Sequence, residues 1–148
     1  MGLSSALMSI EDREAFRLYR WDELPLEKVT EMVSRKIVSG TREMVAQHYM
    51  KKGALVPIHA HESEQMTYVL QGALRALVNG DEVIVREGEI LHVPPHVPHQ
   101  AEAIEDTFTL DLFCPIRPEW LDQPPAFADP AFAKPASASP APATSEEA

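Results

Sequence analysis

The chain has little cysteine, little positive charge and no long apolar run, and each shortage excludes a class of protein. Its single cysteine, Cys114, cannot form an internal disulfide, so we expect a reducing compartment and, by default, the cytoplasm. Lysine and arginine number 13 against 23 acidic residues, which gives a formal charge of −10. Nucleic acids and anionic membrane surfaces bind clustered basic residues, so neither is an expected partner. No run approaches the roughly 18 apolar residues that cross a bilayer, so no membrane span is expected.

The length of 148 residues suits one domain with a sizeable core. From residue 124 onward the composition changes to mostly proline, alanine and serine. Proline removes backbone donors, and small side chains offer little apolar area to offset the entropy of ordering. We therefore predict an N-terminal extension at 1–20, a folded domain at 21–121 and a disordered tail at 122–148.

Short β-type runs separated by turn residues fill the region from Met32 to Cys114. Asn79 and Gly80 lie between two alternating runs, which is a strong signal for a two-residue hairpin. About eight short strands without a helical period between them predict an all-β sandwich or barrel. The expected strands are 32–39, 42–50, 65–70, 73–79, 82–87, 90–93, 99–103 and 107–114. The first thirty residues are compatible with either a short helix or an extra strand.

The heptapeptide HAHESEQ, residues 59–65, contains two histidines two positions apart. On an extended strand the side chains of residues i and i+2 share a face. His59 and His61 would then converge on one point, which is the geometry of a metal site. Two histidines alone do not make such a site, so the residues around them matter.

A regular frame of residues surrounds the histidine pair. Its first half consists of Gly53, five residues, His59, one residue, His61, three residues, Gln65, six residues and Gly72. Its second half consists of Gly88, five residues, Pro94, one residue, His96, two residues and His99. These spacings resemble the paired motifs of the cupin superfamily, a small double-stranded β-barrel (jelly roll) that binds a divalent metal inside. The resemblance implies four metal ligands, namely His59, His61, Gln65 and His99.

The chain departs from the usual cupin motifs at three positions. Gln65 replaces a glutamate, His96 replaces a glycine and Ala103 replaces an asparagine. All four implied ligands are neutral, so the ion would keep more of its electrophilic character and favour Lewis-acid chemistry. Nickel, zinc, manganese and iron all remain open as the metal. Glu64 would be a ligand only if the motif loop were one residue shorter, because on a strand it faces away from Gln65.

The other three histidines are interpreted as paired or surface groups, with one of them a candidate for the pocket mouth. They are His48, His92 and, at the mouth, His96.

The last predicted strand carries a further set of polar residues. Asp111 and Phe113 share one face of it, and an aspartate there is unusual unless that face lines a polar cavity. Arg117 follows just past Pro115. With the histidine frame, this set resembles the KdgF group of cupins over about Trp21 to Leu121. Those proteins convert unsaturated uronates from pectin or alginate breakdown into the linear keto-uronate, and the resemblance also implies a homodimer.

The three residues suit that chemistry. Asp111 can move protons at the ring carbons, and Phe113 can form an apolar wall. Arg117 can clamp the sugar carboxylate, which an acidic chain would otherwise repel. The alternatives are a structural carboxylate for Asp111 and a surface salt bridge for Arg117.

Three other classes of function remain open for such a chain. It could be another metal cupin enzyme, such as a dioxygenase or isomerase of a small organic acid. It could be a non-catalytic cupin that binds a sugar or effector, or a structural barrel with an incidental metal. The fold alone does not decide among them, because cupin barrels support many chemistries.

Overall fold

The structure is a computed structural model and describes residues 15–121. The expected tail and most of the expected N-terminal extension lie outside these residues. In chain order the elements are η1 Trp21–Glu23, β1 Glu27–Lys28, β2 Val33–Ser39, β3 Met44–Met50, β4 Leu55–His59, β5 Glu64–Gln71, β6 Ala73–Val78, β7 Asp81–Arg86, β8 Ile90–Val93, β9 His99–Ala103, β10 Thr107–Cys114 and η2 Pro118–Trp120. The prediction of an all-β fold is confirmed.

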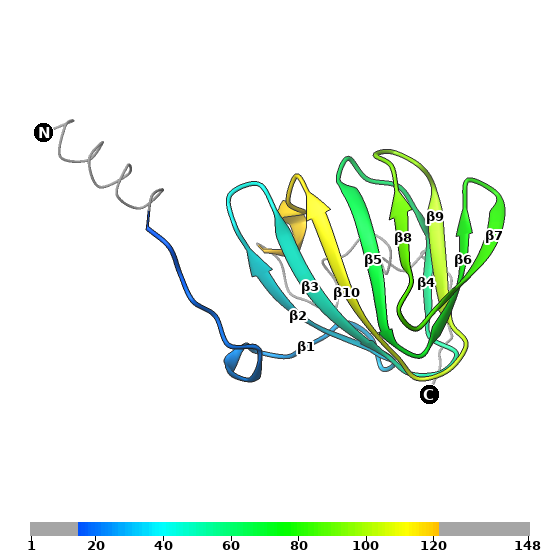
Figure 1. Cartoon of the computed structure of the whole chain (residues 1–148), viewed down its shortest axis with the longest axis horizontal. Helices are drawn as coiled ribbons and strands as arrows, with labels where there is room; N and C mark the ends of the chain where they lie inside the picture. Colours follow the sequence, from blue (N-terminus) through cyan, green and yellow to red (C-terminus); the bar gives the residue numbers. More distant parts are fainter. Residues whose placement is uncertain (1–14, 122–148) are drawn as a thin grey trace, which may run out of the picture.

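Two antiparallel sheets face each other and enclose the core (Figure 1). The six-stranded sheet has the order β1-β2-β3-β10-β5-β8, and the four-stranded sheet has the order β4-β9-β6-β7. Strand β10 pairs with β3 on one side and with β5 on the other, so it lies inside the larger sheet. Between residues 15 and 121, no helix is long and apolar enough to cross a membrane.

All eight predicted runs form strands, because alternating side chains and turn residues mark them locally. The sequence did not predict β4 as a separate strand. Its burial does not alternate, and it contains Pro57. Proline is tolerated there because β4 is an edge strand that pairs only with β9. The undecided N-terminal part supplies both the short helix η1 and the extra strand β1.

The core has two parts, and the second one fixes the C-terminal segment. The larger part lies between the sheets and includes Val69, Leu74 and Val85. The smaller part consists of Met44, Ala46, Phe113 and Trp120, which pack together. Trp120 belongs to η2, so this cluster fastens the segment after β10 onto β3 and β10.

Glycines make two of the turns possible. The β6–β7 hairpin has Asn79 at φ 50° and Gly80 at φ 90°, as a two-residue hairpin of type I′ requires, and its prediction is confirmed. Gly72, between β5 and β6, has φ 93°. A Cβ at Gly72 would lie 2.8 Å from the Cα of Thr107 and closer still to the carbonyl oxygen of Asp106.

These two glycines provide a matched test of the packing. Gly80→Ala meets no atom within 4 Å, so it should cost only the backbone strain, about 1 kcal/mol. Gly72→Ala adds a clash with backbone and should cost about 3 kcal/mol or more. Denaturant unfolding of the two variants measures the difference. Equal losses would show that the close approach at Gly72 is not a constraint.

Candidate active site

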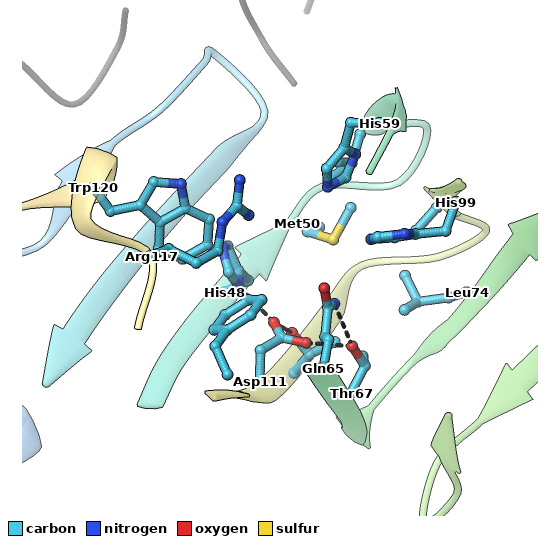
Figure 2. A pocket seen from close by; sticks show the side chains of 14 residues that line it. His48, Met50, His59, Gln65, Thr67, Leu74, His99, Asp111, Arg117 and Trp120 are labelled. Atoms are coloured by element: carbon cyan, nitrogen blue, oxygen red, sulfur yellow. Dashed lines mark hydrogen bonds and ion pairs between the residues drawn. The ribbon is translucent and has the colours of Figure 1, made fainter. Parts of the chain in front are cut away.

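One cavity lies between the sheets, and most of the predicted site residues line it (Figure 2). The predicted residues in its wall are His59, Gln65, His99, Asp111, Phe113 and Arg117. Apolar side chains, among them Met50, Val56 and Leu74, form other parts of the wall. The four-stranded sheet and the six-stranded sheet each contribute, so the site depends on the closed fold.

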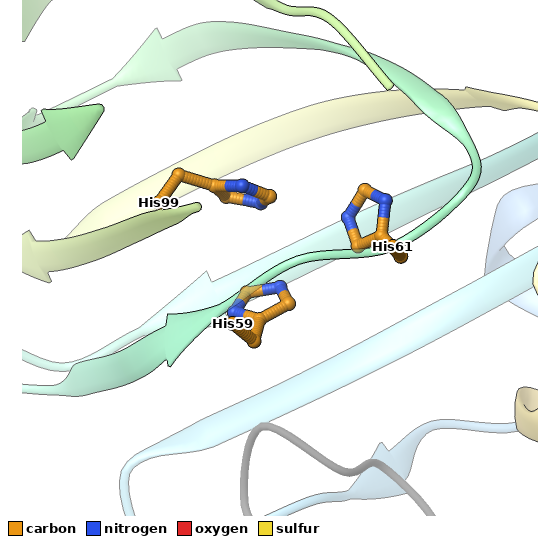
Figure 3. Close-up of side chains that lie close together, drawn as sticks. All are labelled: His59, His61 and His99. Atoms are coloured by element: carbon orange, nitrogen blue, oxygen red, sulfur yellow. The ribbon is translucent and has the colours of Figure 1, made fainter. Parts of the chain in front are cut away.

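Three histidines converge at one end of this site (Figure 3). His59 is the last residue of β4 and pairs in register with His99, the first residue of β9. His61 lies beyond the end of β4, so the two close-spaced histidines do not converge by sharing one face of a strand. The turn after β4 nevertheless brings His61 back to the other two. One ring nitrogen from each histidine lies within 4.8 Å of the others.

The hydrogen bonds of the three histidines fix the same tautomer in each ring. Every Nδ1 donates to a backbone carbonyl two residues away, at 2.9 Å for His59, 2.9 Å for His61 and 2.8 Å for His99. A neutral imidazole that donates through Nδ1 presents a lone pair at Nε2. Each ring is thus oriented by a backbone partner, as metal-bound histidines usually are.

The buried Nε2 of His99 shows that these residues fit a metal. Within residues 15–121 it has no hydrogen-bond partner. Buried polar atoms in proteins are rarely left unsatisfied, so each exception requires an explanation. A divalent cation among the three Nε2 atoms would supply the missing interaction.

Burial keeps the three imidazoles neutral. It lowers the pKa of His59 from 6.5 to about 4, and the Pro57 carbonyl opposes this only in part. Burial is also the largest cause that lowers the pKa of His61 and of His99, and the nearby Arg117 cation lowers both further. Metal ligands must be deprotonated, so at neutral pH the site is already in the binding form.

Gln65 completes the group from the opposite sheet. Its Oε1 lies 3.0 Å from Nε2 of His61. Because His61 donates through Nδ1, both of these atoms are acceptors, an arrangement that suits two ligands of one cation. Glu64 is exposed and lies 2.6 Å from His92 through its carboxylate, so the alternative that Glu64 replaces Gln65 is wrong.

Asp111 is 5% exposed and accepts hydrogen bonds at both carboxylate oxygens. The Thr67 hydroxyl donates to Oδ1 at 2.5 Å, and the Thr109 hydroxyl donates to Oδ2 at 3.0 Å. Nδ1 of His48 lies 2.6 Å from the same Oδ2. The carboxylate is therefore held in one orientation in the cavity wall (Figure 2).

Arg117 is 4% exposed, so the alternative of a surface salt bridge is wrong, although its Nε does donate to Glu119 at 2.9 Å. Its guanidinium carbon lies 4.4 Å from the ring centre of Trp120 and 5.5 Å from that of Phe113. Guanidinium groups stack favourably on aromatic faces. Phe113 also contacts the ring of His61, so it links the arginine to the histidine group.

His92 and His96 lie on the surface. His92 is exposed and pairs with Glu64, while the His96 side chain is exposed in the turn before β9. His96 has φ 66°, which explains why a glycine is usual at this motif position. Its backbone N–H donates to the His61 carbonyl at 2.7 Å and so ties the two motif segments together.

Sequence reasoning missed four residues of the site. They are the polar and aromatic wall residues His48, Thr67, Thr109 and Trp120. Arg35 was missed as well; it is fully buried, with its guanidinium carbon 4.1 Å from the ring centre of Trp120. Two of the missed residues carried a usable signal. Arg35 shares strand parity with Val33, and His48 shares it with Ala46, and both of these apolar residues are buried. A polar residue at the inward parity of a strand indicates a polar cavity.

Comparison with known proteins identifies the class of protein. Residues 47–115 match the family description of a cupin domain. This range contains all four implied ligands, and the fold described above agrees with it. The chain therefore contains a cupin domain.

Individual relatives narrow the class. The pectin degradation protein KdgF of Dickeya dadantii (strain 3937) is 28% identical over 104 residues, covering 68% of this chain and 94% of that protein. The solved structure of KdgF from a Halomonas species is 29% identical, with a TM-score of 0.66, and covers 70% of this chain and 96% of that one. An RmlC-like cupin from Shewanella frigidimarina has a TM-score of 0.66 at 26% identity, with 70% and 94% covered. The chain, with its cupin domain, is therefore similar to KdgF proteins.

Loss of one imidazole should abolish metal binding. We expect His99→Ala, loaded with zinc and desalted, to retain far less than one equivalent, because it removes a buried ligand atom. His92→Ala is the matched control, since His92 is on the outer surface and should retain wild-type zinc. Elemental analysis measures both. Full zinc in His99→Ala would remove His99 from the ligand set.

The metal-free protein should lose stability as the pH falls. Unfolded His59 binds a proton near pH 6.5, whereas the folded form does so only near 4. Between these values the unfolded state holds more protons, so stability rises with pH, by at most about 3 kcal/mol from this group. We expect unfolding in a chelator to show this loss between pH 7 and 4.5, and His59→Gln to reduce it. An unchanged pH dependence of stability in His59→Gln would show that the lowered pKa of His59 is not the cause of the loss.

Proposed function

We propose that this protein is a metal-dependent cupin enzyme that opens the ring of a 4,5-unsaturated uronate to give the linear keto-uronate. The observation that carries the proposal is the presence, in one cavity, of a buried carboxylate and a buried guanidinium opposite three converging histidines. The similarity to a protein named for pectin degradation supports the substrate class. The proposal takes the protein to be cytoplasmic, as expected from its single cysteine, and homodimeric, as the resemblance to cupins implies.

The substrate is a cyclic enol ether that carries a carboxylate. Arg117 would bind that carboxylate, because its planar fork matches two carboxylate oxygens and it is held in place by Glu119 and the Trp120 ring. The Phe113 ring would pack against the sugar and keep water away from that side. A local cation is needed, since the chain as a whole repels anions with its charge of −10.

A divalent metal held by His59, His61, Gln65 and His99 would supply Lewis-acid polarisation of substrate oxygens. The remaining chemistry is proton movement by the chain. Water adds across the double bond, with a proton to C4 and the oxygen to C5. The resulting hemiketal then opens as the C5–O5 bond breaks, the C5 hydroxyl loses its proton and the ring oxygen gains one.

Asp111 is the group we assign to these proton transfers, and the structure adds His48 as its partner at 2.6 Å. An aspartate alone would have to exchange its proton with solvent while buried. A neighbouring imidazole can accept or return that proton, as in other carboxylate–histidine pairs. The Thr67 and Thr109 hydroxyls orient the carboxylate throughout.

Removal of the proton carrier should stop turnover. We expect Asp111→Asn to lower kcat by about 10²–10⁴, the usual loss for a positioned general acid or base. The ultraviolet absorbance of the conjugated double bond reports the reaction directly. Glu64→Gln is the control, because Glu64 lies on the outer face and should keep wild-type activity. If metal-loaded protein opens unsaturated galacturonate, mannuronate and guluronate products no faster than they open spontaneously, the proposed function fails.

Arg117→Lys tests separately whether Arg117 binds the substrate carboxylate. Lysine keeps the charge but loses the planar fork and the stacking on Trp120. We expect KM for the uronate to rise by about tenfold or more, with zinc content unchanged. An unchanged KM would mean that the carboxylate binds elsewhere.

A further inference from the structure

Thr67 links the proposed metal ligand Gln65 to the buried carboxylate of Asp111. It faces Asp111 directly across the β5–β10 pairing, and Gln65 precedes it by two residues on the same strand. Residues two apart on a strand share a face, so all three side chains point into the cavity (Figure 2). Thr67 is 6% exposed.

The hydrogen bonds through Thr67 run in one direction. Nε2 of Gln65 donates to the Thr67 hydroxyl oxygen at 2.9 Å, and the Thr67 hydroxyl donates to Asp111 at 2.5 Å. An ionised carboxylate can only accept hydrogen bonds, so the single hydroxyl proton of Thr67 must point toward Asp111. Hydrogen bonds to charged groups are roughly twice as strong as neutral ones, which keeps the Thr67 hydroxyl proton directed at the carboxylate.

This direction decides which end of the Gln65 amide faces the histidines. With its proton committed to Asp111, the Thr67 oxygen is an acceptor and selects the NH₂ end of the amide. The carbonyl Oε1 is then left 3.0 Å from Nε2 of His61. Rotation of the amide by half a turn would place NH₂ among the imidazole nitrogens, where it could not ligate a cation.

We propose that Thr67 is a positioning residue that sets the amide of Gln65 with its oxygen toward the metal site, under the direction of Asp111. The inference rests on the metal site of the proposed function but not on the uronate reaction. It also gives Asp111 a second role, since the same carboxylate that moves protons orients a metal ligand. A glutamate at position 65 would have no such requirement, because its two oxygens are equivalent.

Zinc affinity of the full chain tests the inference without any substrate. We expect Thr67→Val, which replaces only the hydroxyl by a methyl group, to weaken zinc binding about tenfold or more, the usual effect of removing a group that orients a metal ligand. Thr67→Ser keeps the hydroxyl and should bind within about threefold of wild type. Thr109→Val is the matched control, because the Thr109 hydroxyl also donates to Asp111 but is not hydrogen-bonded to Gln65. Competition against a chromogenic chelator measures all three.

A double-mutant cycle separates orientation from packing. In a Gln65→Glu background the residue at 65 no longer has a wrong orientation, so adding Thr67→Val should change zinc affinity by less than about threefold. An equal loss in both backgrounds would show that Thr67 acts only through packing and would overturn the inference. No loss in either background would overturn it as well.

A measurement on the native sequence covers the case in which Thr67→Val does not fold. In zinc-loaded protein, nuclear Overhauser effects should connect the side-chain NH₂ of Gln65 to Thr67. Contacts of that NH₂ with the imidazole rings of His61 or His99 would overturn the inference. Failure of the uronate assay alone would leave both the zinc and the NMR results in place, so the two failures can be told apart.

Discussion

The pairing of β10 with β3 on one side and β5 on the other is the constraint on which the site depends. It places Thr109 opposite His48, Asp111 opposite Thr67 and Phe113 opposite Gln65. Side chains alternate along a strand, so a slip by one residue would turn Asp111 to the outer surface and an adjacent leucine into the cavity. One register therefore sets the positions of the proposed metal ligand Gln65, the proposed proton carrier Asp111 and the aromatic ring of Phe113.

Burial then determines the charges of the side chains in the cavity. It keeps the three imidazoles neutral, which leaves their lone pairs for a cation, while the two charged groups of the cavity are each compensated locally. Asp111 accepts hydrogen bonds from two hydroxyls and lies against His48, and Arg117 pairs with Glu119 and stacks on Trp120. Buried charges need such partners because isolated ones are strongly destabilising. The same partners also hold the Asp111 carboxylate and the Arg117 guanidinium in one orientation.

Most strands could be predicted from the sequence because alternation and turn residues are local, whereas β4, an edge strand with a proline, lacked that signature. Motif spacing suggested the histidines and Gln65, and the structure brings them together, while their roles as ligands remain predictions. His48 was not assigned to the site because its partner Asp111 lies 63 residues away, and only the sheet pairing reveals that contact. Trp120 and Arg35 were missed for the same reason, since η2 must first dock on β3 and β10.

The central claim is that three imidazole nitrogens and one neutral amide oxygen form a single metal site beside Asp111 and Arg117. Crystals of zinc-loaded protein, measured with anomalous scattering at the zinc edge, test it most directly. The account predicts one strong anomalous peak coordinated by Nε2 of His59, His61 and His99 and by Oε1 of Gln65, with Asp111 uncoordinated. A zinc ion coordinated instead by Asp111 and His48, or no peak among the three histidines, would contradict it.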